Sequence, residues 1–203
     1  MEITSIEPRR KGLSQLYING EQAMKLDTFV LTTMGIKVGK ELTDEELYAL
    51  IQASDARRAQ EKALYLLEFR SHSKKELAEK IARTAASKEA AAEAVNRMEE
   101  LGLLDDRAYA ESLARSLINR KKYGTRRVRQ ELRFKGIDTE MIDEILMDYE
   151  DQDFDETIRD FLEKKYADFR EDPAVKRRAI AALNRRGYDY DEIKRAMHAE
   201  IEE

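Results

Sequence analysis

The sequence of 203 residues contains no cysteine and no tryptophan, and it has only two histidines and two prolines. The absence of cysteine excludes disulfide bonds, thiolate metal sites and a cysteine nucleophile. Two histidines, His72 and His198, argue against a histidine-rich metal site and against a histidine-based catalytic triad. We therefore expect no catalytic residue, no metal and no cofactor, and the protein is not predicted to be an enzyme.

Charged residues make up 39% of the chain, whereas hydrophobic residues make up 42% and aromatic residues only 7%. A usual charged fraction is about 25%, so this chain has a thin core and much surface. That balance favours an elongated helical array over a single compact sphere. No apolar run has the length of a signal peptide or of a membrane span, so we expect a soluble, cytoplasmic protein that does not contact a membrane.

The first 40 residues differ from the rest, because they hold four of the eight glycines. Apolar residues alternate on both sides of Asn19-Gly20, a pair that supplies the positive φ angles of a type I′ hairpin turn. Phe29-Val30-Leu31 is expected to add a short strand. These features predict a small β-hairpin element.

After Gly39 the hydrophobic period becomes that of a helix. Thr43-Asp44-Glu45-Glu46 fits a capping box and predicts a leading helix from about 43 to 53. Ser73-Lys74-Lys75-Glu76 repeats the signal, and Asp172-Pro173 places a capping residue before a proline at the first helical position. About ten helices are expected.

The helical part of the chain repeats at an offset of 51 residues. Apolar positions align in register, and Gly136-Ile137-Asp138 aligns with Gly187-Tyr188-Asp189. The aligned apolar groups are Leu77, Val128 and Ala179; Ile81, Leu132 and Leu183; Val95, Leu146 and Met197; and Leu67, Ile118 and Phe169. Three helices are therefore predicted in each unit, at 56–70, 74–84 and 88–101, then at 106–120, 125–135 and 139–149, then at 154–169, 174–186 and 190–202.

The predicted fold is mainly α, with three tandem three-helix repeats that stack into an elongated curved rod. A small N-terminal β-hairpin element and a leading helix precede the repeats. The predicted ranges are 1–40 for the β element, 41–55 for the leading helix, and 56–105, 106–153 and 154–203 for the repeats.

Two segments resemble ligand loops and are rejected. The segment from Gly35 to Glu41 is one residue short of a phosphate loop, and Glu41 stands where a magnesium-binding Ser or Thr should be. The acidic run from Asp151 to Asp155 resembles a calcium loop but lacks its glycine and its last glutamate. We interpret this run as the acidic N-terminus of a helix, where carboxylates suit the helix dipole.

Charge is segregated along the chain. Residues 107–136 contain ten basic and two acidic residues, whereas residues 138–163 contain twelve acidic residues and one basic residue. Arg126, Arg129 and Arg133 are spaced to share one helix face, and that face could be merely solvated or could bind phosphates or an acidic protein. The candidate binding residues are Lys121, Lys122, Arg126, Arg127, Arg129, Arg133, Lys135, Arg177, Arg178, Arg185 and Arg186.

Three ordered segments resemble motifs of the RecX regulatory protein family. The first runs from Ala63 to Leu77 and contains an Arg-x-x-Ser-x-x-x-Leu core at residues 70–77. The second, residues 102–110, reads Gly-Leu-Leu-Asp-Asp-Arg-Ala-Tyr-Ala, and the third, residues 122–137, holds a Glu-Leu-x-x-Lys-Gly-Ile block. Residues 183–188 are similar to the family's weaker third repeat. The resemblance covers about residues 59–200.

The resemblance implies a modulator of RecA recombinase that lies in the groove of the RecA–DNA filament. It implies that ATPase, strand-exchange and coprotease activities fall, that the partner supplies nucleotide hydrolysis, and that the fold is a set of tandem three-helix repeats. The expected partners are the RecA filament and the DNA within it, and the chain is expected to be a monomer. Two alternatives remain: a stand-alone DNA-binding module that uses the basic middle repeat, and a helical-repeat scaffold for another protein.

Overall fold

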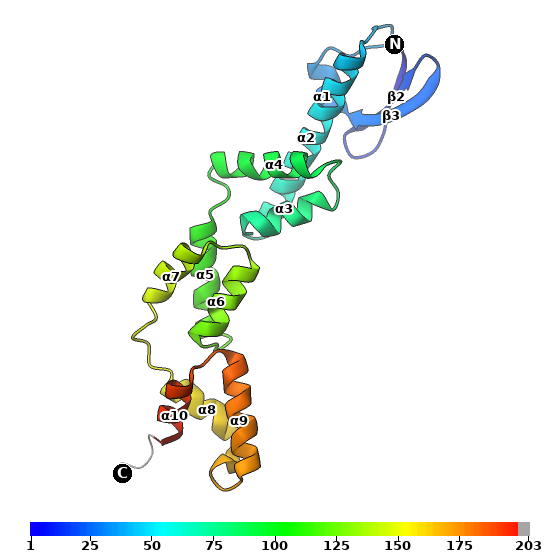
Figure 1. Cartoon of the computed structure of the whole chain (residues 1–203). Helices are drawn as coiled ribbons and strands as arrows, with labels where there is room; N and C mark the ends of the chain where they lie inside the picture. Colours follow the sequence, from blue (N-terminus) through cyan, green and yellow to red (C-terminus); the bar gives the residue numbers. More distant parts are fainter. Residues whose placement is uncertain (199–203) are drawn as a thin grey trace. The chain divides into compact units, whose positions relative to one another are not determined.

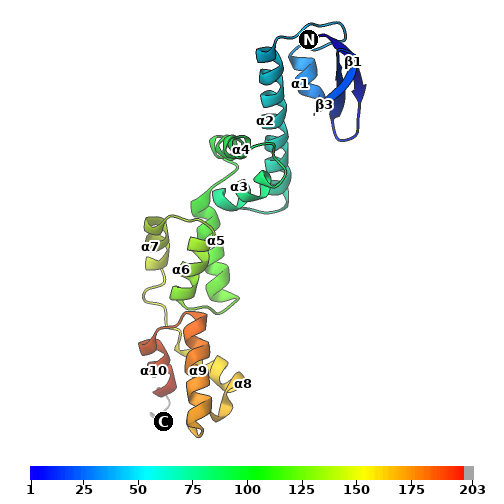
Figure 2. The same ribbon diagram turned by 45° about the vertical axis from the view of Figure 1, so that its right-hand side comes forward.

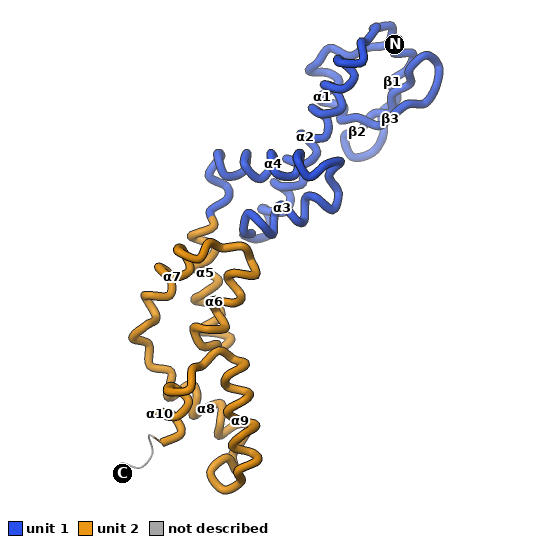
Figure 3. Tube along the Cα trace, in the orientation of Figure 1, with its two compact units in different colours: residues 1–105 blue, residues 106–203 orange. Residues whose placement is uncertain are grey.

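The computed structural model describes residues 1–198 in two compact units, Met1–Asp105 and the chain from Asp106 onward (Figure 3). The described residues are mainly helical, with a small antiparallel sheet at the N-terminus (Figure 1). This architecture confirms the predicted fold class of a mainly α chain with a small β element. The curved rod concerns how the two units are arranged and stays a prediction, as does the division into five ranges.

Three strands form the N-terminal sheet: β1 (Ile3–Pro8), β2 (Leu13–Ile18) and β3 (Glu21–Asp27). They pair antiparallel in sequence order. The predicted hairpin is present, because Asn19 and Gly20 join β2 to β3 with φ angles of 51° and 85°. Strand β1 was not predicted from the sequence, because the turn between β1 and β2 has no such signal.

The predicted strand at residues 29–31 is wrong, because Thr28–Thr33 forms the short helix α1. The side chain of Asp27 caps this helix by accepting a hydrogen bond from the Val30 N–H at 3.1 Å. Val30 and Leu31 are buried in the core below the sheet. Tertiary burial and the cap therefore override the β propensity of Phe-Val-Leu.

Helix α2 (Asp44–Phe69) begins at the predicted capping box. Glu46 N–H donates to the Thr43 hydroxyl at 3.1 Å, and Thr43 N–H donates to the Glu46 carboxylate at 2.9 Å. The helix then continues without a break, so the predicted end near residue 53 and new helix at 56 are wrong. No Gly or Pro occurs between residues 44 and 69 to end it.

Helix α2 joins two apolar cores within the first unit. Its first half places Leu50 against Ile3 and Leu16 of the sheet. Its second half places Ala59 and Ala63 against helices α3 (Lys74–Ala82) and α4 (Lys88–Glu100). The three-helix group predicted first along the chain is therefore present, but its first helix also supports the sheet.

The second unit contains two further three-helix groups (Figures 1 and 2). The first consists of α5 (Asp106–Asn119), α6 (Thr125–Phe134) and α7 (Thr139–Met147). The second consists of α8 (Asp155–Lys165), the 3₁₀ turn η1 (Ala167–Arg170), α9 (Pro173–Arg186) and α10 (Tyr190–His198). The predicted helices agree with these bounds to within two residues, with two exceptions. The helix predicted at 154–169 is wrong at its end, because α8 ends at Lys165 and η1 follows it. The predicted end of the last helix at 202 lies outside the described residues.

The 51-residue repeat is visible in matching turns of the second unit. Gly136 and Gly187 have φ angles of 80° and 93°, and the next residues, Ile137 and Tyr188, are buried. The residue after each of these is an aspartate whose side chain accepts a hydrogen bond from a backbone N–H of the following helix. Two aligned pairs are completely buried in the same core: Val128 with Ala179, and Leu132 with Leu183. The same helix–turn–helix geometry therefore occurs twice.

Candidate partner-binding surface

Helix α6 presents arginines on one side and buries apolar residues on the other. Val128 and Leu132 are fully buried, whereas Arg126 and Arg133 are exposed. Arg129 lies at the edge of the exposed face, where its guanidinium donates to the carboxylate of Asp143 on α7. Arg126 and Arg133 therefore face solvent as the spacing predicted, whereas Arg129 also ties α6 to α7.

Two other predicted basic residues of this segment have local contacts. Arg127 forms an ion pair with Glu131 one turn along α6, at 2.6 Å, and its guanidinium lies 5.9 Å from the centre of the Tyr123 ring. Lys135 is half-buried and ends α6 as its C-terminal cap residue. These side chains contribute less unpaired charge than the sequence suggests.

Helix α9 carries a second group of basic residues. Arg177, Arg178 and Arg185 are all exposed, and none forms an ion pair with another residue in the range 1–198. Arg178 and Arg185 are seven residues apart and so lie two turns apart on one face. This face is available to an anionic partner.

The two groups of helices in the second unit meet where the end of α9 reaches the beginning of α6 (Figure 2). Gly124 N–H donates to the Arg186 carbonyl at 3.0 Å, and Arg126 N–H donates to the Gly187 carbonyl at 3.3 Å. The first residues of α6 lack a side-chain cap, so carbonyls at the end of α9 satisfy N–H groups that would otherwise be unpaired. The dipoles of the two helices favour this contact, since a negative end meets a positive end.

Two glycines make this contact possible. A Cβ on Gly124 would lie 2.4 Å from the Gly187 carbonyl oxygen, and a Cβ on Gly187 would lie 2.2 Å from the Arg127 nitrogen. Both neighbours are backbone atoms that cannot rotate away. We name this contact between residues 124–127 and 186–188 the α6–α9 junction.

Arg186 and Tyr188 also hold the loop that precedes α6. The Arg186 guanidinium donates to the carbonyls of Lys121 and Lys122 at 3.3 and 3.4 Å, and the Tyr188 hydroxyl donates to the Lys122 carbonyl at 2.9 Å. Burial raises the pKa of Tyr188 to about 12, so the hydroxyl keeps its proton and remains a donor. Lys121 and Lys122 thus have fixed backbones and exposed side chains.

The structure divides the predicted basic residues into three places. One group lies on α6 and at its C-terminal cap: Arg126, Arg127, Arg129, Arg133 and Lys135. A second group consists of Lys121 and Lys122, in the loop before α6, and of Arg186, which holds this loop from the α6–α9 junction. The remaining three lie along α9. The contact roles of Gly124 and Tyr188 were not predicted from the sequence. In the sequence, Gly124 marks a helix break and Tyr188 aligns with Ile137 in the repeat, but neither signal reveals a contact between repeats.

The two rejected ligand loops have structural roles. Gly39 N–H donates to the Ile3 carbonyl at 2.8 Å and Ile36 N–H to the Leu31 carbonyl at 2.8 Å, so these backbone groups are not presented to a phosphate. Asp155 begins α8 and accepts a hydrogen bond from Arg195 of α10 at 3.1 Å. Among residues 1–198 there is no cluster of three or more His, Asp or Glu side chains able to hold a metal ion.

His72 is buried between α2 and α3, with its Nδ1 atom 3.3 Å from the Glu76 carboxylate. Burial lowers the pKa of His72, and the nearby Arg70 and Lys80 act in the same direction, whereas Glu76 opposes them. Its burial between α2 and α3 indicates a structural role. Within the part of the chain that the structure describes, no helix has the length and apolar character needed to cross a membrane.

Comparison with known proteins identifies the family. Models of the second and third three-helix domains of RecX match residues 105–146 and 151–197. A protein of Caldanaerobacter subterraneus subsp. tengcongensis named regulatory protein RecX is 30% identical over 200 residues, which are 98% of this chain and 99% of that protein. The chain belongs to the RecX family.

Further relatives agree with this assignment. A regulatory protein RecX of Stenotrophomonas maltophilia is 39% identical over 137 residues, covering 67% of this chain and 83% of that protein. A crystal structure described as regulatory protein RecX has the same fold, with a TM-score of 0.70 and 24% identity over 97% of this chain and 98% of that one. The crystal structure of RecX from Lactobacillus salivarius has a TM-score of 0.63 and 25% identity, over 72% of this chain and 97% of that one.

The two matched RecX domains correspond to α5–α7 and α8–α10. All the basic candidate residues lie inside these domains, and the α6–α9 junction is the contact between them. The relatives are named as regulatory proteins rather than as enzymes.

Proposed function

We propose that this chain regulates RecA recombinase by binding in the groove of the RecA–DNA filament and lowering its ATPase, strand-exchange and coprotease activities. The observation that carries the proposal is the similarity to regulatory protein RecX over nearly the whole chain. Such a role belongs to DNA repair and recombination. We infer that the chain acts as a cytoplasmic monomer with no catalytic site of its own.

The charge distribution of the second unit supports a partner that is part protein and part DNA. Exposed arginines on α6 and α9 suit phosphates or carboxylates. The acidic stretch of residues 138–163, which includes α7 and most of α8, would be repelled by bare DNA but could meet basic protein surfaces. A filament that exposes both protein and nucleic acid satisfies both requirements.

The test is a titration of RecA on single-stranded DNA with this chain, measured as ATP hydrolysis and filament length. Near-stoichiometric chain should reduce both. The variant Arg126→Glu/Arg129→Glu/Arg133→Glu should inhibit less while keeping its helicity. Because Arg129 also binds Asp143, the double variant Arg126→Glu/Arg133→Glu separates binding from packing.

A matched control comes from exposed cations of the same unit outside the candidate set. Arg115→Glu/Lys194→Glu makes the same change in charge as the double variant and should inhibit like the wild type. Unchanged hydrolysis and filament length with the wild-type chain would contradict the proposed function. Equal inhibition by the double variant and the wild type would show that the α6 arginines are only a solvated face.

The second candidate function is a stand-alone DNA-binding module, favoured by the ten basic residues of residues 107–136. It predicts binding to bare DNA whose affinity falls steeply with salt. Binding that requires RecA would count against it. A scaffold for another protein would instead be detected by a pull-down in which that protein, and not RecA, is retained.

A further inference from the structure

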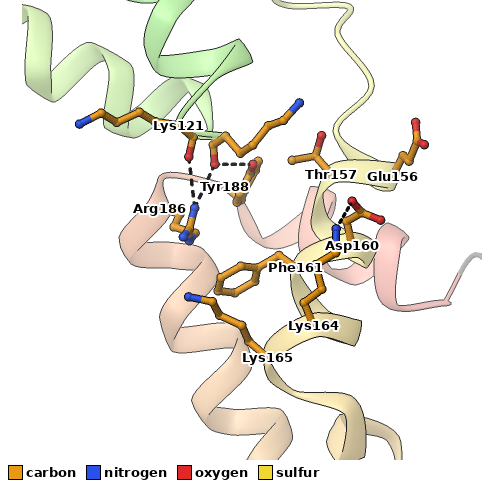
Figure 4. A pocket seen from close by; sticks show the side chains of 10 residues that line it. Lys121, Glu156, Thr157, Asp160, Phe161, Lys164, Lys165, Arg186 and Tyr188 are labelled. Carbon is orange, nitrogen blue, oxygen red and sulfur yellow. Dashed lines mark hydrogen bonds and ion pairs between the residues drawn. The ribbon is translucent and has the colours of Figure 1, made fainter.

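A cleft of about 440 Å³ lies beside the α6–α9 junction (Figure 4). Three segments of the second unit line it: the loop with Lys121 and Lys122, the face of α8 from Glu156 to Lys165, and the end of α9 with Arg186. Tyr188 closes one side through its hydrogen bond to the Lys122 carbonyl. The cleft therefore exists only because the two RecX domains of this unit meet here.

Positive charge predominates in the lining of the cleft. Five cationic side chains line it, against the carboxylates of Glu156 and Asp160. Lys164 donates to Asp160 at 2.9 Å, and this contact lowers the pKa of Asp160 and raises that of Lys164, so these two charges offset each other. The lining cations are Lys121, Lys122, Lys164, Lys165 and Arg186.

Three of these cations remain without a carboxylate partner. Lys121, Lys122 and Lys165 form no ion pair within residues 1–198. Arg186 is already occupied, since it donates to two carbonyls and its guanidinium lies 4.4 Å from the centre of the Phe161 ring. Figure 4 shows the side chains of Lys121 and Lys165 extending from different segments and ending apart from each other, and the Lys165 ammonium lies 5.7 Å from the centre of the Phe161 ring. The three ammonium groups therefore border the cleft at separate places, where single carboxylates of a partner could meet them.

The loop that carries two of these ammonium groups is held in an unfavourable conformation. Lys122 has a φ angle of 55°, in the left-handed region that residues other than glycine rarely adopt. Arg186 and Tyr188 maintain this conformation through their bonds to the loop carbonyls. A non-glycine residue held in this way is typical of binding sites, where the conformation positions the side chain.

The lining suits an acidic peptide better than a nucleic-acid strand. Glu156, whose carboxylate has no cationic partner in the described part of the chain, would oppose a strand that carries a phosphate at every nucleotide. The face of Phe161 that Arg186 covers is not open for stacking on a base. In contrast, a peptide places single carboxylates among neutral groups, and Thr157 offers a polar contact to those groups.

We propose that this cleft binds an acidic segment of a protein partner, with aspartate or glutamate side chains pairing with Lys121, Lys122 and Lys165. The proposal does not depend on the proposed regulation of RecA, because it predicts only that the bound segment is acidic and not which protein carries it. It assigns to the contact between the two domains a recognition role in addition to its structural one.

The experiment measures binding of a short fluorescein-labelled peptide of alternating Glu and Ser to the full chain, by fluorescence anisotropy at low salt. The test variant is Lys121→Gln/Lys122→Asn/Lys165→Gln, in which asparagine tolerates the positive φ angle. The control is Arg115→Gln/Lys176→Gln/Lys194→Gln, which removes three exposed cations of the same unit away from the cleft. Circular dichroism verifies that both variants are folded.

The test variant should bind the peptide about tenfold more weakly, and the control within about twofold of the wild type. If the triple variant misfolds, Lys165→Gln alone, on the exposed face of α8, should weaken binding in the same direction. Equal loss in test and control variants would overturn the proposal, as would failure of the wild type to bind. A third outcome would also overturn the proposal: the wild type binds an oligothymidylate of matched charge more tightly than the peptide, and the test variant loses this binding. That outcome would assign the cleft to nucleic acid.

Discussion

Replacing Gly187 with alanine is the sharpest perturbation of the α6–α9 junction. The new Cβ would lie 2.2 Å from the Arg127 nitrogen and 2.4 Å from the Arg127 Cβ, and these positions overlap. Gly187 also has a φ angle of 93°, which an alanine adopts only with strain. The substitution therefore combines a backbone penalty with a steric one.

The magnitude follows from these separate contributions. An alanine in the left-handed region costs about 1–2 kcal/mol. Overpacking against atoms that cannot rotate away costs about 1–3 kcal/mol. Moving α6 away from α9 would also weaken the hydrogen bonds of Gly124 and Arg126 to α9 carbonyls, at about 0.5–1.5 kcal/mol each. We expect Gly187→Ala to lower the free energy of unfolding of the second unit by about 3–8 kcal/mol.

Two other glycines separate the contributions. Gly102 has a φ angle of 69°, and no atom lies within 4 Å of the place that a Cβ would take there, so Gly102→Ala should show the backbone penalty alone, in the first unit. Gly124 lacks a positive φ angle but would place its Cβ 2.4 Å from the Gly187 oxygen, so Gly124→Ala should show the steric penalty alone. The expected order of destabilisation places Gly187→Ala above both.

The assay is urea unfolding followed by circular dichroism, with amide hydrogen exchange to assign the loss of protection to each unit. Gly187→Ala and Gly124→Ala should increase exchange in α6 and α9, whereas Gly102→Ala should not. If Gly187→Ala cost no more than Gly102→Ala, the reasoning from close backbone approach would be refuted. Unchanged exchange at the beginning of α6 would refute it as well.

Three further predictions concern buried groups. Val128→Asp or Leu132→Asp should cost at least about 3 kcal/mol of stability and unfold the core of the second unit, because each buries an unpaired charge. Far-UV circular dichroism checks this prediction. A double variant that stays helical and soluble would contradict the assigned register. Burial lowers the pKa of His72 in the folded chain, so as pH falls the imidazole of the unfolded chain binds a proton first. The free energy of unfolding should therefore fall as pH drops below 6.5, the ordinary pKa of histidine. His72→Gln should flatten the dependence of stability on pH in this range, as measured by urea unfolding at a series of pH values. Asp155→Asn should cost about 1–3 kcal/mol by weakening the bond to Arg195, measured by thermal unfolding, and no effect would show that the pair is solvent-screened.

The sequence predicted local structure best at positions where a residue type has a single physical role, such as a turn glycine or a helix cap. Asn19-Gly20 predicted a hairpin turn, and Thr43 with Glu46 predicted the start of α2. Gly136 and Gly187 predicted the ends of two helices, since each takes a left-handed conformation there. These signals are local, so they could be recognised without knowledge of the tertiary fold.

The errors arose where tertiary contacts decide the conformation. Phe29, Val30 and Leu31 have the composition of a strand, but the cap at Asp27 and the burial of Val30 and Leu31 against the sheet make this segment helical. The predicted break near residue 55 came from aligning the first repeat with the other two. The continuous α2 contacts the sheet with one half and α3 and α4 with the other, and no local signal encodes this double role.

The candidate site shows the same division between local and tertiary information. Spacing correctly placed Arg126 and Arg133 on the side of α6 opposite to Val128 and Leu132. Spacing could not show that Arg129 pairs with Asp143, because that contact depends on how α7 folds back against α6. The binding role of these residues is a prediction that the proposed titration tests.

The basic residues of the second unit therefore do not act as one uniform surface. Arg186 donates to loop carbonyls and contacts Phe161, so its charge stabilises the contact between the domains rather than attracting a distant anion. Arg127 and Arg129 are offset by carboxylates within hydrogen-bonding reach. The charge available to a partner comes instead from the exposed arginines of α6 and α9 and from the lysines of the cleft. Since the same junction fixes the cleft and joins the two domains, variants that disturb Gly187 should weaken acidic-peptide binding together with stability, whereas neutralising the lysines should weaken binding alone.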